Sequence, residues 1–173
     1  MIFLLGGARS GKSWLATSLA KRTGAPVVFI ATARADDEEM ASRVEEHRRR
    51  RPTDWKVVEA PIELETALGS AYGRETVIVD CVTLWISNLM AERDDDTISQ
   101  LVDAAIASIG DRAGETIVVS NEVGAGIVPM HPVGRRFRDV QGRANQSFAR
   151  AANTAYFVVA GKLLRLSDVD DEL

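Results

Sequence analysis

The sequence predicts an α/β fold, with a mostly parallel sheet and helices on both of its faces. Short apolar runs rich in β-branched residues alternate with segments of helical periodicity, and such alternation is typical of strand–helix–strand crossovers. A glycine-rich turn also joins the first apolar run to the first helical segment. With 173 residues and no internal repeat, residues 1–173 are expected to form a single domain with a sizeable core.

The turn after the first predicted strand, Ile2–Leu5, carries the strongest motif of the chain. It reads Gly6, Gly7, Ala8, Arg9, Ser10, Gly11, Lys12 and Ser13. This order fits G-x-x-x-x-G-K-[ST], and a helical pattern from Trp14 to Arg22 follows. Strand, turn and helix are the context of a P-loop, in which backbone N–H groups and the helix N-terminus face a phosphate. Lys12 is expected to reach the β- and γ-phosphates, and the Ser13 hydroxyl to bind Mg²⁺.

The second predicted strand is Val27–Ala31, an apolar run bounded by Pro26. Thr32, Ala33 and Arg34 follow it at its carboxyl end, where ligands bind in open α/β sheets. Arg34 is therefore a candidate nucleotide contact. The alternative is a solvated loop arginine.

A charged stretch over residues 36–51 indicates a helix, because acidic residues lead and four arginines end it, which suits the helix dipole at both ends. Pro52 makes a continuation unfavourable. Met40, Val44 and His47 fall on one face, and the pattern alone favours a surface helix with a basic last turn. The alternative is catalytic. Positive neighbours favour a neutral imidazole, which is a nucleophile, and the arginines would hold the phosphates that it attacks.

Two further predicted strands carry acidic residues near their ends. Trp55–Pro61 contains Glu59, which would meet either a ligand or a basic neighbour. Thr76–Asp80 is an apolar strand that ends in an acid, which is the form of a Walker B element. Downstream of a P-loop, Asp80 is expected to hold, directly or through water, the Mg²⁺ that Ser13 also binds.

The second half of the chain continues the alternation. The apolar stretch Cys81–Met90 has helical spacing and is expected in the core, with a subunit interface as the alternative. Thr97–Ile109 has the pattern of an amphipathic helix.

The stretch after the next buried strand, Thr116–Ser120, holds two glycines and a proline and predicts a shaped loop at the same sheet edge. Asn121 and Glu122 open this loop and are placed to touch substrate or order a water. A long helix over 135–152 follows, whose arginines bind phosphate or solvent. Ala155–Ala160 is expected to be the last core strand.

Composition narrows the class of protein. The net charge of −4 gives no reason to expect nucleic acid as a partner. Cys81 is the one cysteine in the sequence, so neither an intramolecular disulfide nor a cysteine metal cluster can form, which fits a reducing cytoplasm. No signal peptide is indicated at the N-terminus, and no window approaches the ~20 apolar residues of a membrane span.

Over nearly its whole length the chain resembles the bifunctional adenosylcobinamide kinase / adenosylcobinamide-phosphate guanylyltransferases of cobalamin biosynthesis. The stretches that match, and that are highly specific as a set, are Gly6–Ser13, Ala31–Arg34 with Glu39 and Met40, His47 and Arg48 with Arg51, Pro52 and Trp55, Glu59–Pro61, Val79–Asn88, Ser120–Pro129, and Arg136–Asp139 with Gly142, Asn145 and Gln146. The chain departs from the family after the last strand, where the family commonly has Gly-Leu-Pro and this sequence has Gly161, Lys162 and Leu163. The resemblance therefore leaves the geometry of the C-terminal strand open.

The resemblance implies two reactions on a small-molecule corrinoid. The hydroxyl of the aminopropanol arm of adenosylcobinamide is phosphorylated with ATP or GTP. GMP is then transferred from GTP to that phosphate, giving adenosylcobinamide-GDP and pyrophosphate. The resemblance also implies a P-loop fold like that of recombination ATPases, and a homo-oligomer, since the family includes trimers.

The resemblance assigns the nucleophile of guanylyl transfer to His47, which would carry GMP covalently. It implies that the nucleotide is bound by the P-loop and by Thr32, Ala33, Arg34, Arg48, Arg49, Arg50, Arg51, Glu59 and Asp80. Two rival interpretations of the residues are a monofunctional P-loop kinase in which His47 is idle, and a non-enzymatic GTP-dependent switch.

Overall fold

The computed structural model describes residues 1–35, 37–71 and 73–167, and for Glu39, Arg43, His47 and Arg50 it describes the backbone alone. The described strands are β1 (Ile2–Gly6), β2 (Val27–Ala31), β3 (Lys56–Glu59), β4 (Thr76–Asp80), β5 (Thr116–Asn121), β6 (Thr154–Val159) and β7 (Lys162–Leu166). They form one sheet in the order β3-β2-β4-β5-β1-β6-β7. Neighbouring strands are parallel except β6 and β7, which are antiparallel. The predicted fold class is confirmed.

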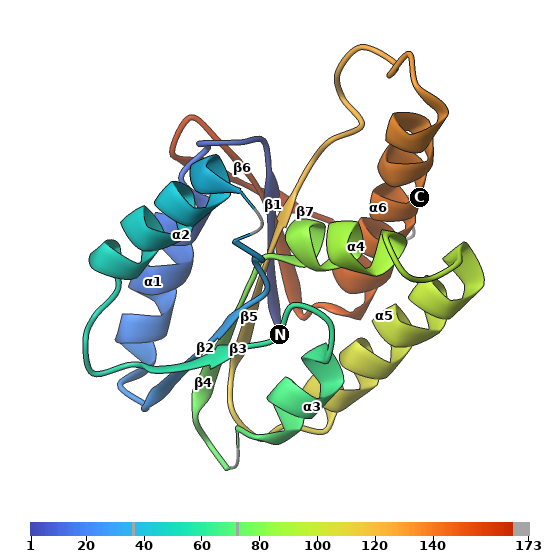
Figure 1. Cartoon of the computed structure of the whole chain (residues 1–173). Helices are drawn as coiled ribbons and strands as arrows, with labels where there is room; N and C mark the ends of the chain where they lie inside the picture. Colours follow the sequence, from blue (N-terminus) through green and yellow to red (C-terminus); the bar gives the residue numbers. More distant parts are fainter. Residues whose placement is uncertain (36, 72, 168–173) are drawn as a thin grey trace.

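Helices cover both faces of the sheet. They are α1 (Lys12–Thr23), α2 (Glu38–Arg50), α3 (Leu64–Gly69), α4 (Val82–Met90), α5 (Asp95–Gly110) and α6 (Pro132–Ala151). Figure 1 shows α1 and α2 on one side of the sheet and α3, α4, α5 and α6 on the other. Strand β5 lies between β1 and β4 and runs parallel to both. The P-loop after β1 and Asp80 at the end of β4 therefore lie at the same carboxyl edge of the sheet.

The two faces of β4 show how the core is divided. Val77 and Val79 pack with the helices α3 to α6, whereas Ile78, between them, packs with α1. This alternation follows from the two-residue period of a strand. A strand buried on both faces is apolar at most of its positions, which is why β4 and β5 contain the uninterrupted apolar runs Val77–Val79 and Ile117–Val119.

The charged helix α2 begins at Glu38, inside the stretch over residues 36–51 that was predicted to be helical, and residue 36 itself lies outside the described residues. The side chain of Asp37 accepts a hydrogen bond from the Met40 N–H at 2.7 Å, which satisfies one of the free donors of the first turn. The helix ends at Arg50, and Arg51 has an extended backbone with φ −80° and ψ 146°, as a residue before proline prefers.

The sheet continues beyond the expected last core strand. The segment after β6, whose geometry the family resemblance left open, forms β7, which pairs antiparallel with β6 through a tight turn. Ala160 and Gly161 occupy that turn with positive φ values of 49° and 73°, which suits the twist of a two-residue hairpin. All five residues of β7 are exposed, so burial periodicity gave no signal for it.

Arg112, just after α5, ties three segments together. Its guanidinium donates hydrogen bonds to the carbonyl oxygens of Leu68 at 3.3 Å and Glu75 at 2.8 Å, and also to that of Ala71. Burial lowers the pKa of this guanidinium, and the acceptors are carbonyl groups at the C-terminal end of α3 and in the turn before β4.

We expect Arg112→Ala to lower the free energy of unfolding by about 2 kcal/mol, because partly buried carbonyl groups lose a charged donor. Urea denaturation measures the change. The matched control is the exposed Arg74, whose replacement by alanine is expected to cost less than about 0.5 kcal/mol. Equal midpoints for the two variants would contradict the structural role of Arg112.

Among the described helices, none combines the length and the apolar character that crossing a bilayer requires.

Candidate active site

The P-loop is a tight turn between β1 and α1. Gly11 precedes the helix with φ 104°, a backbone conformation that favours glycine. Gly6 is needed for another reason, since a Cβ there would collide with the carbonyl oxygen of Val158 in β6. The turn of the β6–β7 hairpin also contacts the loop, because the Gly161 N–H donates to the Ser10 carbonyl oxygen at 2.9 Å. The loop is thus fixed against the sheet by the close approach of β6 at Gly6 and by the hydrogen bond to Ser10.

Lys12 is the first residue of α1 and its side chain folds back over the loop. Its Nζ donates to the carbonyl oxygens of Gly6 at 2.8 Å and Gly7 at 2.6 Å, and it lies 3.3 Å from Ser10 Oγ. The residue is 6% exposed. Burial lowers the pKa of the ammonium group, while Cys81 and Asp80 act in the opposite direction. An ammonium group in the P-loop can neutralise phosphate charge, and the expected contact of Lys12 with the β- and γ-phosphates stays a prediction.

Three of the predicted site residues meet in a cavity of about 160 Å³ beside the first turn of α1. Ser13 comes from α1, Asp80 from the end of β4, and Arg51 from the residue that follows α2. The other lining residues are Trp14, Ala16, Thr17, Phe29 and Ile78. A hydroxyl, a carboxylate and a guanidinium beside a P-loop are suited to bind a metal-bound nucleotide.

Arg51 is held in this cavity by an aromatic side chain. Its guanidinium lies 4.3 Å from the centroid of the Phe29 ring, and Phe29 in turn stacks on Trp55 with ring centroids 6.5 Å apart. Burial lowers the pKa of Arg51, and the charge of Asp80 opposes this shift. A partly buried guanidinium that already lies over an aromatic ring loses less conformational freedom on binding phosphate than a free surface arginine does.

The other arginines of the basic turn point to different neighbours. Arg48 Nη2 lies 3.5 Å from Glu59 Oε1, at the end of β3, and both side chains are well exposed. Arg49 pairs with Glu45 on the surface of α2 at 3.3 Å. The side chains of His47 and Arg50 lie outside the described part of the structure, and their backbone lies in the last turn of α2.

The segment Thr32–Arg34 after β2 contacts residues at both ends of α4. Thr32 is fully buried, and its hydroxyl donates to the Cys81 carbonyl oxygen and accepts from the Cys81 N–H, both at 2.8 Å. Ala33 is half-buried. Arg34 pairs with Glu92 at 3.1 Å. Its predicted contact with nucleotide, like those of Thr32 and Ala33, stays a prediction.

Sequence reasoning did not single out the apolar wall of the cavity. Trp14 directly follows the P-loop serine and is 73% exposed. A large aromatic residue at this place in the sequence was the signal that could have marked it as a wall of the nucleotide site. Phe29 lies two residues before Ala31, on the same face of β2, so the strand period could have placed it toward the site.

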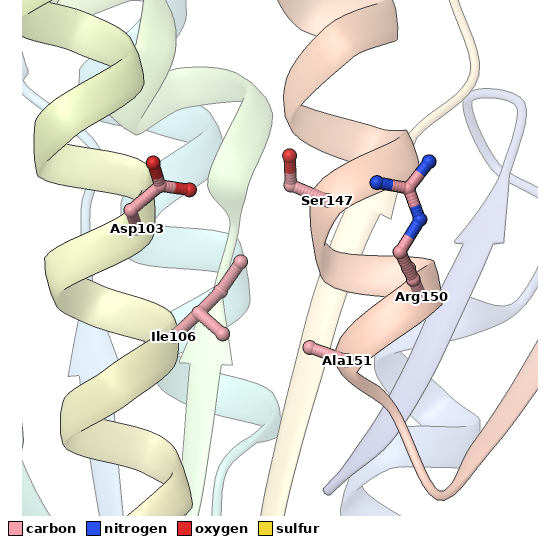
Figure 2. A pocket seen from close by; sticks show the side chains of 5 residues that line it. All are labelled: Asp103, Ile106, Ser147, Arg150 and Ala151. Atoms are coloured by element: carbon pink, nitrogen blue, oxygen red, sulfur yellow. The ribbon is translucent and has the colours of Figure 1, made fainter.

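A larger cavity, of about 350 Å³, lies between α5 and α6. Figure 2 shows Asp103 and Ile106 on one helix and Ser147, Arg150 and Ala151 on the other. Ala151, which also lines it, is the last residue of α6, and only Ala152 and Asn153 separate it from the start of β6. This cavity is therefore toward the amino edge of the sheet, away from the P-loop, and none of the predicted site residues lines it.

A P-loop on a parallel sheet, with an acid from a nearby strand beside the P-loop serine, defines a P-loop nucleotide-binding protein. The fold agrees with solved structures. The chain matches a protein of Pyrococcus horikoshii OT3 with a TM-score of 0.56 at 8% identity, over 99% of this chain and 88% of that one. It matches an ATPase of the type III secretion system of pathogenic bacteria with a TM-score of 0.50 at 14% identity, over 90% of this chain and 50% of that one.

The chain belongs to the cobinamide kinase / cobinamide phosphate guanyltransferase family, whose model matches residues 2–166. It is 43% identical over 159 residues to the bifunctional adenosylcobalamin biosynthesis protein CobP of Pseudomonas aeruginosa, covering 91% of this chain and 92% of the relative. It is 38% identical over 175 residues to the bifunctional adenosylcobalamin biosynthesis protein CobU of Escherichia coli K12, covering 93% and 96%. The chain is thus a bifunctional cobinamide kinase and cobinamide phosphate guanylyltransferase of cobalamin biosynthesis.

Proposed function

We propose that the corrinoid substrate is adenosylcobinamide and that GMP travels to it through His47. In the first reaction the γ-phosphoryl group of ATP or GTP moves to the hydroxyl of the aminopropanol arm. In the second, His47 attacks the α-phosphorus of GTP and releases pyrophosphate, and the corrinoid phosphate then takes GMP from the histidine. A covalent intermediate divides one difficult substitution into two easier ones.

The meeting of Ser13, Arg51 and Asp80 in one cavity is the observation that carries this proposal. Arg51 comes four residues after His47, which is about one helical turn. The backbone of His47 therefore lies one turn from a residue that lines the cavity beside the P-loop. This arrangement supports a site in which the P-loop serves the kinase reaction and the end of α2 serves guanylyl transfer.

The two reactions require attack at different phosphorus atoms of the nucleotide. The γ-phosphorus reacts in the kinase step, and the α-phosphorus in guanylyl transfer. We infer that either the nucleotide shifts along the site or the end of α2 moves over it between the reactions.

We propose Mg²⁺ as the metal of the site, held by Ser13 and Asp80. These two oxygen donors line one cavity beside the P-loop, and Mg²⁺ is usually held by one or two protein groups together with phosphates and waters. No group of three metal-binding His, Cys, Asp or Glu side chains occurs in the described residues, which agrees with such a small protein contribution. When bound, the ion would neutralise charge on the nucleotide phosphates.

We expect Asp80→Asn to keep the fold and to reduce Mg²⁺-dependent turnover by about 10–100-fold, because the change preserves shape and removes one negative charge beside the ion. Rates measured across a Mg²⁺ titration test this. Asp54→Asn, at an exposed position in the turn before β3, is the control. An unchanged rate with an unchanged Mg²⁺ dependence would remove Asp80 from the metal site.

Two parallel incubations distinguish the proposed function from its rivals. Protein that becomes labelled from α-³²P-GTP but not from γ-³²P-GTP supports guanylyl transfer through the enzyme. A corrinoid labelled from the γ-phosphate, with no labelled protein, supports a plain kinase. Tight GTP binding with no transfer of either label supports a switch.

We further propose that residues 1–173 act as one catalytic unit in the cytoplasm and that the enzyme is a homo-oligomer, such as a trimer, that needs no nucleic acid. The described strands form one sheet, which supports a single unit. The edge strand β7 exposes Leu163 and Leu164, and an exposed apolar edge favours association. Sedimentation equilibrium measures the subunit number, and a monomer at micromolar concentration would contradict the oligomer.

A further inference from the structure

A group of buried polar side chains lies at the carboxyl end of β5, apart from the cavity that Ser13, Arg51 and Asp80 line. Ser120 and Gln141 are fully buried, Asn145 is 5% exposed and Thr83 is 7% exposed. They come from β5, α6 and α4. Burial of polar groups costs free energy unless they are hydrogen-bonded. Four buried polar side chains at one strand end therefore need a physical explanation.

These side chains bind one another closely. Asn145 Oδ1 accepts hydrogen bonds from Ser120 Oγ at 2.6 Å and from Gln141 Nε2 at 2.8 Å. Gln141 Nε2 also donates to Ser120 Oγ at 3.0 Å, and Thr83 Oγ1 lies 3.4 Å from that same hydroxyl. Gln141 Oε1 is buried without a hydrogen-bond partner among the described residues. Apolar side chains of similar volume would pack here at lower cost, so stability alone does not account for the network.

The network holds the peptide groups of Asn121 on both sides. The Asn121 N–H donates to Thr83 Oγ1 at 2.7 Å, and the Asn121 carbonyl oxygen accepts from Asn145 Nδ2 at 3.1 Å. Side chains from two helices thus fix the backbone of a residue at the end of a strand. Such fixing sets the direction in which the side chain of Asn121 leaves the backbone before any ligand arrives.

Asn121 lies beside the P-loop at the carboxyl edge of the sheet. It pairs in register with Gly6, the first residue of the P-loop. The strand that carries it lies between the P-loop strand and the strand that carries Asp80. Its side-chain amide lies 3.9 Å from the sulfur of Cys81, the residue after Asp80. Asn121 itself is half-buried, so its side chain is reachable from the carboxyl edge, where ligands bind.

We propose that Asn121 is a further catalytic residue of the kinase reaction, whose side-chain amide donates a hydrogen bond to the γ-phosphoryl group during transfer. Thr83, Gln141 and Asn145 are positioning residues that act through it. The inference rests on the proposed function, because it names a contact of the same phosphoryl transfer.

The proposed phosphoryl transfer requires no proton transfer to or from Asn121. The oxygen of the corrinoid hydroxyl forms a bond to the γ-phosphorus, and the bond from that phosphorus to the bridging oxygen breaks. The nucleoside diphosphate leaves with the bonding electron pair, and the hydroxyl proton is released to water. A fixed amide can stabilise the charge on the transferring group with no reorganisation at the moment of reaction.

The test measures the kinase reaction and enzyme guanylylation separately. We expect Asn121→Ala to lower the kcat of corrinoid phosphorylation by about 10²–10³-fold, the loss typical of one preorganised donor. Binding of a non-hydrolysable GTP analogue and labelling of the enzyme from α-³²P-GTP should stay within about threefold of wild type, because these depend on P-loop contacts and on the α-phosphorus. The control is Gln100→Ala, an exposed amide on α5.

A matched pair at Thr83 tests the positioning role. Thr83→Ser keeps the hydroxyl that accepts from Asn121, and kcat should stay within about threefold of wild type. Thr83→Val removes the hydroxyl at nearly the same volume, and kcat should fall at least about tenfold with little change in the nucleotide KM. A merely structural role would lower thermal stability in Thr83→Val without this split between kcat and KM.

Should Asn121→Ala fail to fold, the nearly isosteric Asn121→Asp replaces the donor by an anion that repels phosphate, and a loss at least as large is expected. The inference is overturned if the folded Asn121 variants phosphorylate the corrinoid at near wild-type kcat. It is also overturned if they lose guanylylation and GTP binding to the same extent as kinase activity, since this would make Asn121 a general structural residue. Failure of the proposed function is distinct, because the wild-type protein itself would then transfer no phosphoryl group to the corrinoid.

Discussion

Replacement of Lys12 by alanine is expected to reduce both reactions by about 10²–10³-fold, the cost of removing one preorganised charge-stabilising group. Lys12 Nζ already bridges the carbonyl oxygens of Gly6 and Gly7 over the loop. Phosphate charge must be neutralised when the γ-phosphorus is attacked and again when pyrophosphate departs. Under the proposed function both reactions bind the nucleotide at the same P-loop, so one ammonium group would serve both.

Steady-state rates of each half-reaction, measured separately, test the expectation for Lys12. The control is Lys21→Ala, at the exposed last turn of the same helix, which should retain both rates. Circular dichroism and urea denaturation must show that the Lys12 variant is folded, since its removal also leaves carbonyl groups without a donor. A folded Lys12→Ala protein with normal rates in both reactions would remove the P-loop from the mechanism.

The parts of the site that could be predicted from the sequence are those fixed by local chain geometry. Gly6–Ser13 forms the turn between β1 and α1 as the motif requires, because the collision at Gly6 and the positive φ at Gly11 leave little choice of residue. Asp80 ends a strand that is buried on both faces, and the apolar run before it shows where the acid must emerge. Sequence and structure agree where spacing along one strand or one turn decides the outcome.

The sequence could not tell which arginine of the basic turn enters the cavity. Arg48, Arg49, Arg50 and Arg51 are consecutive and alike in chemistry. Among the side chains that the structure describes, those of Arg48 and Arg49 pair with acidic groups at the surface, whereas Arg51, just after the end of α2, lines the cavity. A ring on another strand, Phe29, then holds it. Contacts between distant segments of this kind leave no period in the sequence.

The buried polar network escaped prediction for a related reason. Gln141 and Asn145 are four residues apart on a helix with many charged residues, and such a spacing reads as part of a solvated face. Their burial results from the packing of α6 against β5 and α4, where Ser120 contacts both side chains and Thr83 lies next to Ser120. Polar residues lie on both the exposed and the buried side of α6, so polarity alone does not separate the two.

Removal of the His47 side chain has the largest expected effect on one reaction alone. His47→Ala should abolish labelling of the protein from α-³²P-GTP and with it guanylyl transfer to the corrinoid phosphate, because no nucleophile would remain to carry GMP. Corrinoid phosphorylation should largely persist, since phosphoryl transfer depends on positioning and charge stabilisation around the P-loop. The backbone of His47 lies in the last turn of α2, one turn before Arg51 in the cavity.

The chemistry of the label identifies the residue that carries it. A phosphoramidate on histidine is labile to acid and stable to base, whereas an ester on serine shows neither property. The label from α-³²P-GTP should therefore be lost in acid and survive alkali. The control is His131→Ala, an exposed residue at the start of α6, in which the label should persist. An acid-stable label, or one that remains in His47→Ala, would place the nucleophile elsewhere in the chain. Loss of kinase activity in a folded His47→Ala protein would instead mean that both reactions use His47, because its assignment to guanylyl transfer alone predicts that kinase activity survives.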